Sequence, residues 1–97
     1  MTAMARTFFV YMMTNAGNTV LYIGVTGDLP TRVWQHRNGH GGFTAHYRLK
    51  KLVWWEMYGD PRTAIGREKQ LKAGSRARKV ALVSGMNPEW RDLYGEL

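Results

Sequence analysis

Apolar residues gather in three short segments, each bounded by polar or turn-forming residues, and this pattern predicts three β-strands. The first two, 8–13 (FFVYMM) and 20–25 (VLYIGV), are separated by the turn-forming sequence TNAGNT. A connection of this length between two short strands predicts an antiparallel hairpin. The third strand is predicted over 52–58 (LVWWEMY), where the consecutive residues Trp54 and Trp55 point to opposite faces.

Side-chain alternation decides which residues of the hairpin lie together. The second strand has an aliphatic face and a face that carries an aromatic ring. The two sets are Leu21, Ile23 and Val25, and Val20, Tyr22 and Gly24. Tyr11 lies near the middle of the first strand, so antiparallel pairing predicts that Tyr11 and Tyr22 come close together. Gly24 has no side chain, and we expect it to leave room for the approach of a backbone or a ligand.

Three segments that begin with capping residues predict helices. These segments and their expected caps are 30–37 (Asp28 or Thr26), 61–73 (Asp60) and 76–86 (Ser75). Ala64, Ile65 and Leu71 contribute to the apolar face of the second helix. The glycine-rich segment 39–48 is predicted to be a loop, and the C-terminal segment is expected to contain one more short helical turn.

The order β-β-α-β-α-α predicts an α+β fold in which helices flank a small three-stranded antiparallel sheet. The chain has 97 residues, and at this length we expect one domain over 1–97. A hydrophobic content of 44% is sufficient for one core.

The composition limits the chemistry that the chain can carry. Since it contains no cysteine, disulfides, thiolate metal sites and cysteine nucleophiles are excluded, and any metal must bind to oxygen or imidazole ligands. No apolar run approaches the roughly 18 residues of a membrane span. No small-residue cleavage site follows the apolar stretch near the start. We therefore expect a cytoplasmic protein that does not act on a membrane.

The formal net charge of +7 favours a polyanionic partner, and nucleic acid is the first candidate. Basic residues precede the third strand and crowd the later helices. The residues that we expect to contact nucleic acid are Gly24, Lys50, Lys51, Lys72 and Arg76. A solvated basic surface without a specific ligand is the alternative interpretation.

Arg32 and His36 are spaced i, i+4 in the first predicted helix, so they share one face just after the strand that carries Tyr22. Such a set suits phosphodiester chemistry. A guanidinium stabilises charge on non-bridging oxygens, and a tyrosinate or a neutral histidine can activate water. Phosphodiester hydrolysis also usually requires a divalent cation, which carboxylate and water oxygens hold.

Simpler explanations exist for each residue alone. Tyr11 and Tyr22 can be ordinary strand aromatics, and Arg32 can belong to a solvated helix face. Glu68 can be one partner of an i, i+4 pair with Lys72.

The ordered set, however, resembles the GIY-YIG nuclease family. The second family motif is literal, Tyr22-Ile23-Gly24, and Val10-Tyr11-Met12 stands where Gly-Ile-Tyr is usual. The Arg-x-x-x-His spacing and a later glutamate, Glu68, also match. The resemblance covers about residues 8–93. It is closest to the small single-domain members, which are similar to the N-terminal nuclease domain of the excision-repair endonuclease.

The resemblance implies a role for each matched residue. Glu68 would hold one divalent metal ion, Mg²⁺ or Mn²⁺, and Arg32 would contact the scissile phosphate. Tyr22 or Tyr11 would generate or position the nucleophilic water, with His36 as a hydrogen-bonding partner or an alternative base. His46 and Asn87 are further candidates, because some members carry a second histidine and a late asparagine.

These observations favour a metal-dependent endonuclease that cuts structured or damaged DNA in repair or recombination. The sequence does not exclude RNA as the substrate. Its specificity would come from a partner protein or a homodimer. A catalytically weak or inactive nucleic-acid-binding module is the first alternative. A protein-interaction domain with structural tyrosines is the second.

Overall fold

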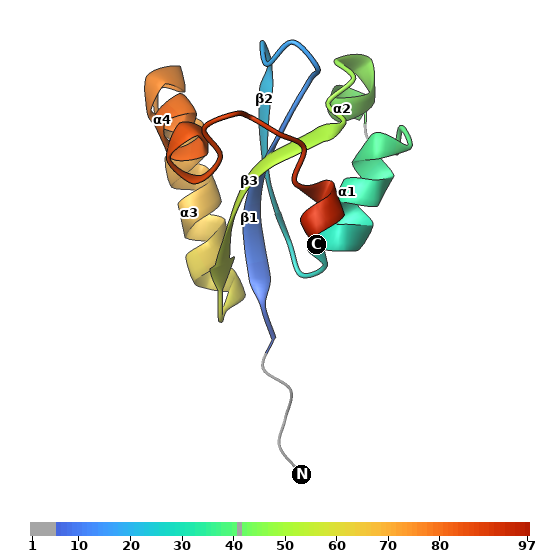
Figure 1. The fold of residues 1–97 in the computed structure, drawn as a ribbon. Coiled ribbons are helices and arrows are strands. Elements are labelled where there is room, and N and C mark those ends of the chain that lie inside the picture. The colour runs from blue at the N-terminus through green and yellow to red at the C-terminus, as the bar shows by residue number, and fades with distance from the viewer. Residues whose placement is uncertain (1–5, 41) are drawn as a thin grey trace.

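Three antiparallel strands form the centre of the molecule in the computed structural model, which describes residues 6–40 and 42–97 (Figure 1). The elements are β1 (Phe8–Thr14), β2 (Leu21–Thr26), α1 (Leu29–Arg37), α2 (Gly42–His46), β3 (Lys51–Tyr58), α3 (Pro61–Ala73), α4 (Arg76–Met86) and a 3₁₀ turn (Tyr94–Glu96). The predicted α+β class, the three strands and the three predicted helices are confirmed.

The sheet has the strand order β2-β1-β3, so β2 and β3 are its edges. The predicted hairpin is confirmed, and its register pairs Tyr11 with Gly24 and Met13 with Tyr22. Between β1 and β3 the register shifts by one residue, because Met12 pairs with Trp54 while Met13 pairs with Leu52. The extra residue on β3 is a β-bulge, which lets two consecutive side chains face the same core.

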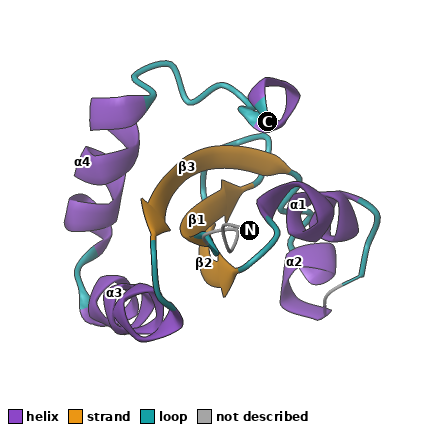
Figure 2. Ribbon diagram, turned by 90° about the horizontal axis from the view of Figure 1, so that it is seen from below, coloured by secondary structure: helices purple, strands orange, loops and turns teal. Residues whose placement is uncertain are grey.

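Helices cover both faces of the sheet, and Figure 2 shows the resulting three layers. On one face α3 and α4 enclose a buried cluster: Val10, Met12, Ile23, Val53, Trp54, Ala64, Leu71 and Val83. On the other face α1, α2 and the C-terminal turn lie over a second cluster: Tyr11, Met13, Leu29, Val33, Leu49, Leu52 and Leu93. Trp55 packs against the second cluster, so the two tryptophans face opposite layers as predicted.

The helix starts follow the predicted capping. The side chain of Asp28 accepts from the Thr31 amide, Asp60 accepts from two amides of α3, and Ser75 accepts from the Arg78 amide. Ile65 was expected on the apolar face of α3 but is 41% exposed, because the packed side of this helix is formed by Ala64 and Leu71.

The prediction of a loop over 39–48 is wrong at 42–46, where α2 forms. This short helix is held by tertiary contacts rather than by its own propensity. The side chain of Thr44 is buried against His36, and the ring of Phe43 packs near the ring of Tyr22. These contacts are made with residues outside the helix, so the sequence of the segment alone does not predict that a helix forms there.

Within the described ranges, none of the helices has the length and apolar character needed to cross a membrane.

Candidate active site

Tyr11 packs directly against Gly24, its partner in the β1–β2 ladder. A Cβ atom on Gly24 would lie 2.5 Å from both Cζ and the hydroxyl oxygen of Tyr11. The expectation that Gly24 leaves room for a ligand is therefore wrong, because the side chain of the neighbouring strand fills that space. Gly24 is buried, and its missing side chain leaves the space that the Tyr11 ring occupies.

Tyr11, His36 and Thr44 form a buried chain of hydrogen bonds that joins β1, α1 and α2. The hydroxyl oxygen of Tyr11 lies 2.7 Å from Nε2 of His36, and Nδ1 of His36 lies 2.9 Å from Oγ1 of Thr44. All three side chains are buried. Thr44 was not predicted as part of the site, and no sequence signal marks it, because its role depends on how α2 packs against α1.

The surroundings of this chain set its protonation. Burial lowers the pKa of His36 to about 4, and the positive charge of Arg32 acts in the same direction. Burial raises the pKa of Tyr11 well above its usual value, and the nearby Tyr22 adds to this effect while Arg32 opposes it. At neutral pH Tyr11 therefore keeps its proton and His36 is uncharged. When the Tyr11 hydroxyl donates to Nε2, Nδ1–H is left to donate to Thr44.

A cavity of about 130 Å³ lies beside this chain, with room for roughly four water molecules. Its lining consists of Tyr22, Arg32, His36, Gly42, Phe43 and Thr44. The ring centroids of Tyr22 and His36 are 5.3 Å apart, and those of Tyr22 and Tyr11 are 6.3 Å apart. The predicted proximity of the two tyrosines is confirmed. Tyr22 lines the cavity, whereas Tyr11 lies behind it and is 1% exposed.

A groove of about 380 Å³ follows the open edge of β2 from this cavity. It is lined by Leu21, Tyr22, Ile23, Phe43, Lys72 and Lys79. Tyr22 and Phe43 belong to the linings of both spaces. Because β2 is an edge strand, side chains from both layers of the molecule meet here. The predicted phosphate contact Lys72 therefore lies beside the candidate active site.

A sequence profile of the GIY-YIG catalytic domain matches residues 7–81. The chain belongs to the GIY-YIG family. Members of this family are typically nucleases, and GIY-YIG nucleases generally use divalent metal ions.

Several small proteins resemble this GIY-YIG chain over most of their length. A UPF0213 protein of Vibrio cholerae is 37% identical over 81 residues, which cover 81% of this chain and 79% of the relative. A UPF0213 protein of Staphylococcus saprophyticus is 37% identical over 65 residues, covering 66% and 79%. The solution NMR structure of the UPF0213 protein BH0048 from Bacillus halodurans superposes with a TM-score of 0.55 at 25% identity. That superposition covers 89% of this chain and 92% of the other.

Glu68 is the predicted metal ligand of this GIY-YIG domain. It lies on α3 one turn before Lys72, which lines the edge groove, but Glu68 itself lines neither that groove nor the cavity of Tyr22, Arg32 and His36. Its Oε1 is 3.5 Å from Nζ of Lys72, and its side chain is 15% exposed. In residues 6–40 and 42–97 there is no group of three or more histidine and acidic residues that could hold a metal ion. A single carboxylate fits Mg²⁺, which keeps several waters and shares substrate phosphates. The residues thus fit a metal site that substrate completes.

The other predicted contacts lie farther from the cavity. Nζ of Lys51 donates to the side-chain oxygen of Asn18, and a guanidinium nitrogen of Arg76 donates to the backbone carbonyl of Asn18. Both residues therefore lie at the β1–β2 turn. Lys50 lines a separate basic cavity near the same turn.

His46 and Asn87 do not line the cavity of Tyr22, Arg32 and His36. His46 is exposed on α2, where its ring packs edge-on against Tyr47. Asn87 is buried at the end of α4, and its amide nitrogen donates to the carbonyls of Val53 and Arg91. Its amide oxygen accepts from the Arg91 backbone. These bonds give Asn87 a structural position that ties the C-terminal segment to β3.

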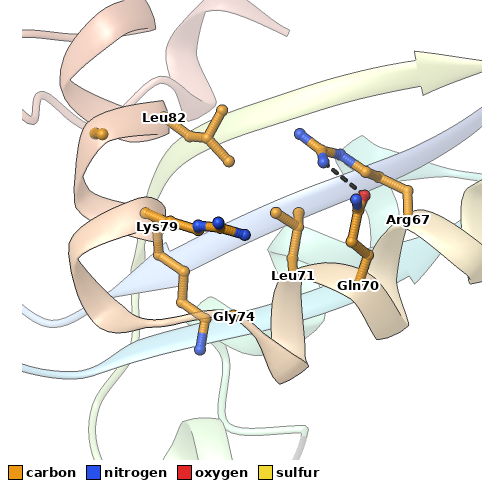
Figure 3. A pocket seen from close by; sticks show the side chains of 8 residues that line it. Arg67, Gln70, Leu71, Gly74, Lys79 and Leu82 are labelled. Atoms are coloured by element: carbon orange, nitrogen blue, oxygen red, sulfur yellow. Dashed lines mark hydrogen bonds between the residues drawn. The ribbon is translucent and has the colours of Figure 1, made fainter.

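A further cavity of about 340 Å³ lies between α3 and α4 (Figure 3). Leu71 and Leu82 give it an apolar wall, and its rim is basic. Arg67 on this rim donates to Gln70 and also pairs with Glu56. None of the candidate catalytic side chains lines this cavity, but Lys79 belongs to both it and the edge groove. The basic surface of the two later helices therefore continues toward the candidate active site.

Proposed function

We propose that this protein is a metal-dependent endonuclease that hydrolyses phosphodiester bonds in DNA, with structured or damaged DNA as its substrate. One observation carries the proposal. The cavity at the open edge of the sheet brings Tyr22, Arg32 and an uncharged His36 together, and Tyr22 also lines the adjoining groove with Lys72, the ion-pair partner of Glu68. The family, whose members are typically nucleases, supports the same chemistry.

Arg32 binds the scissile phosphate in this proposal. One of its terminal nitrogens donates to Oε1 of Gln35 at 2.9 Å, which holds the side chain against the helix. A guanidinium has five N–H donors in a fixed plane, so it can serve two phosphate oxygens at once. Its charge then stabilises the negative charge that builds on the non-bridging oxygens during attack.

Tyr22 positions the attacking water, because it is the tyrosine that lines the cavity. His36 lines the same cavity, but its Nε2 is bonded to the Tyr11 hydroxyl and its Nδ1 to Thr44, so it acts here as the hydrogen-bonding partner that fixes this wall and not as the base. Tyr11 holds the imidazole ring in place through its hydroxyl group.

Glu68 would hold Mg²⁺ or Mn²⁺ together with phosphate oxygens and water, and such an ion supplies charge neutralisation and a lowered pKa for bound water. The ion pair with Lys72 holds the Glu68 side chain near the lysine that lines the groove.

The test is the cleavage of labelled single-stranded, duplex, flapped and branched DNA with Mg²⁺ or Mn²⁺. We expect cleavage by the wild type that depends on the metal, and rates at least about 100-fold lower in Arg32→Ala and Glu68→Gln. Arg62→Ala is the matched control, since it removes an exposed arginine of α3 that lines none of the cavities described above.

Two outcomes would contradict the proposal. Cleavage that survives both substitutions belongs to a contaminating nuclease. Salt-sensitive DNA binding by the wild type without cleavage of any substrate would support the alternative, a nucleic-acid-binding module.

A further inference from the structure

Two exposed aromatic side chains extend the wall of the catalytic cavity outward. Phe43 on α2 is 50% exposed, and Tyr47, just after α2, is 45% exposed. The ring centroid of Phe43 lies 6.0 Å from that of Tyr22 and 4.7 Å from that of Tyr47. The three rings therefore form a continuous series from the cavity to the outer surface.

The outer end of this series opens on a basic cavity of about 440 Å³. Its lining combines the β1–β2 turn with the segment before β3: Asn15, Ala16, Gly17, Arg37, Tyr47, Arg48, Lys50, Lys51 and Asp92. Two of its four cations already have polar partners, because Arg37 pairs with Asp92 and Lys51 donates to Asn18. Arg48 and Lys50 are exposed, so they are the cations best placed to receive an anion.

Exposed aromatic rings next to cations suit an unpaired nucleic-acid strand. The faces of unpaired bases are available for stacking on aromatic side chains, while cations follow the phosphates. In a duplex the base faces are covered by neighbouring bases, so Phe43 and Tyr47 could not stack on them and would add little binding free energy. The position of Phe43, in the linings of both the catalytic cavity and the edge groove, places a stacked base next to the scissile phosphate.

We propose that Phe43 and Tyr47 stack on bases of an unpaired DNA strand whose phosphates lie along Arg48 and Lys50. The preferred DNA then has a single-stranded segment beside the cleaved bond. This inference rests on the proposed function for the identity of the polymer, but its test measures binding and does not require hydrolysis.

The experiment is fluorescence anisotropy in EDTA with three labelled DNAs, namely a single strand, a blunt duplex and the same duplex with a single-stranded arm. We expect Phe43→Ala and Tyr47→Ala to raise the Kd for single-stranded and armed DNA by roughly 5- to 150-fold each. The Kd for the blunt duplex should change less than about twofold. Trp34→Ala is the matched control, because Trp34 is 48% exposed and lines none of the cavities described above.

Arg48→Gly separates binding from folding. Arg48 has a φ of +55°, a conformation that glycine adopts more readily than arginine. We expect the variant to be at least as stable as the wild type but to bind armed DNA more weakly, with a smaller salt dependence.

Three results would contradict stacking of Phe43 and Tyr47 on an unpaired DNA strand. The aromatic variants could lose affinity equally for blunt and armed DNA, or neither variant could lose affinity. The wild type could also bind single-stranded RNA more tightly than DNA of the same sequence. If Phe43→Ala and Tyr47→Ala lose affinity for armed DNA but the wild type cleaves no substrate, the stacking proposal stands and the proposed nuclease activity is contradicted.

Discussion

The hydroxyl oxygen of Tyr11 lies 2.7 Å from Nε2 of His36, and this buried contact ties the central strand to the helix that carries Arg32. The two residues are 25 positions apart in the chain. Their contact sets the orientation of the imidazole ring in the wall of the cavity that Tyr22 and Arg32 also line. It also makes the stability of the fold and the geometry of the site depend on the same pair.

Removing the Tyr11 hydroxyl group should therefore destabilise the protein. In Tyr11→Phe the buried Nε2 of His36 loses its partner, and we expect the free energy of unfolding to fall by about 1–3 kcal/mol. His36→Leu removes the other partner, and the double variant should lose less than the sum of the two single losses. Urea unfolding of all four proteins measures this coupling. Losses that add within about 0.5 kcal/mol would show that the two groups do not act as a pair.

The pKa of His36 predicts how stability changes in mild acid. The unfolded chain binds a proton at His36 near pH 6.5, whereas the folded protein does so near pH 4. Between these values the unfolded state holds more protons, so the free energy of unfolding should fall as the pH decreases, by at most about 1.4 kcal/mol per pH unit from this residue. Above pH 6.5 His36 should contribute no slope.

His36→Leu should flatten this part of the curve, while His46→Gln, which changes an exposed histidine, should keep it. Asp60 contributes only at lower pH, because hydrogen bonds from Thr63 hold its pKa below the ordinary value of 3.8. Urea unfolding between about pH 4.5 and 7.5 therefore isolates the histidine. A wild-type slope equal to that of His36→Leu would contradict the prediction.

Gly24 should not tolerate even one added methyl group. In Gly24→Ala the new Cβ would lie 2.5 Å from the Tyr11 ring, so the ring must move and its bond to His36 is disturbed. We expect a loss of about 1–3 kcal/mol in the free energy of unfolding, together with reduced cleavage. Gly27→Ala is the control, because its Cβ would meet Phe8 only at 3.7 Å. Equal thermal midpoints for the two variants would refute the close packing of Tyr11 on Gly24.

Lys72 should act as a phosphate contact rather than as a source of specificity. We expect Lys72→Ala to weaken the binding of all DNAs to a similar extent and to lower the slope of log K against log salt by about 1. Lys69→Ala is the control, because it removes an exposed lysine of the same helix that lines none of the cavities described above. Identical salt slopes for wild type and Lys72→Ala would place the DNA backbone elsewhere.

Short-range pattern and spacing determined much of this protein. Turn-forming residues between apolar segments indicated the hairpin, and alternation assigned Tyr22 and Ile23 to opposite faces. Asp60 and Ser75 marked helix starts, because a cap satisfies backbone amides within three residues of itself. The spacing of Arg32 and His36 placed both on one face of a helix, and both line the cavity.

Only the tertiary structure decided how these pieces act together. It formed α2 by burying Thr44 against His36, filled the space at Gly24 with the ring of Tyr11, and left Tyr22 as the tyrosine that lines the cavity. Each outcome depends on contacts between residues that are distant in the chain. Local propensity carries no information about which side chain will occupy a given space, because packing across layers assigns that space.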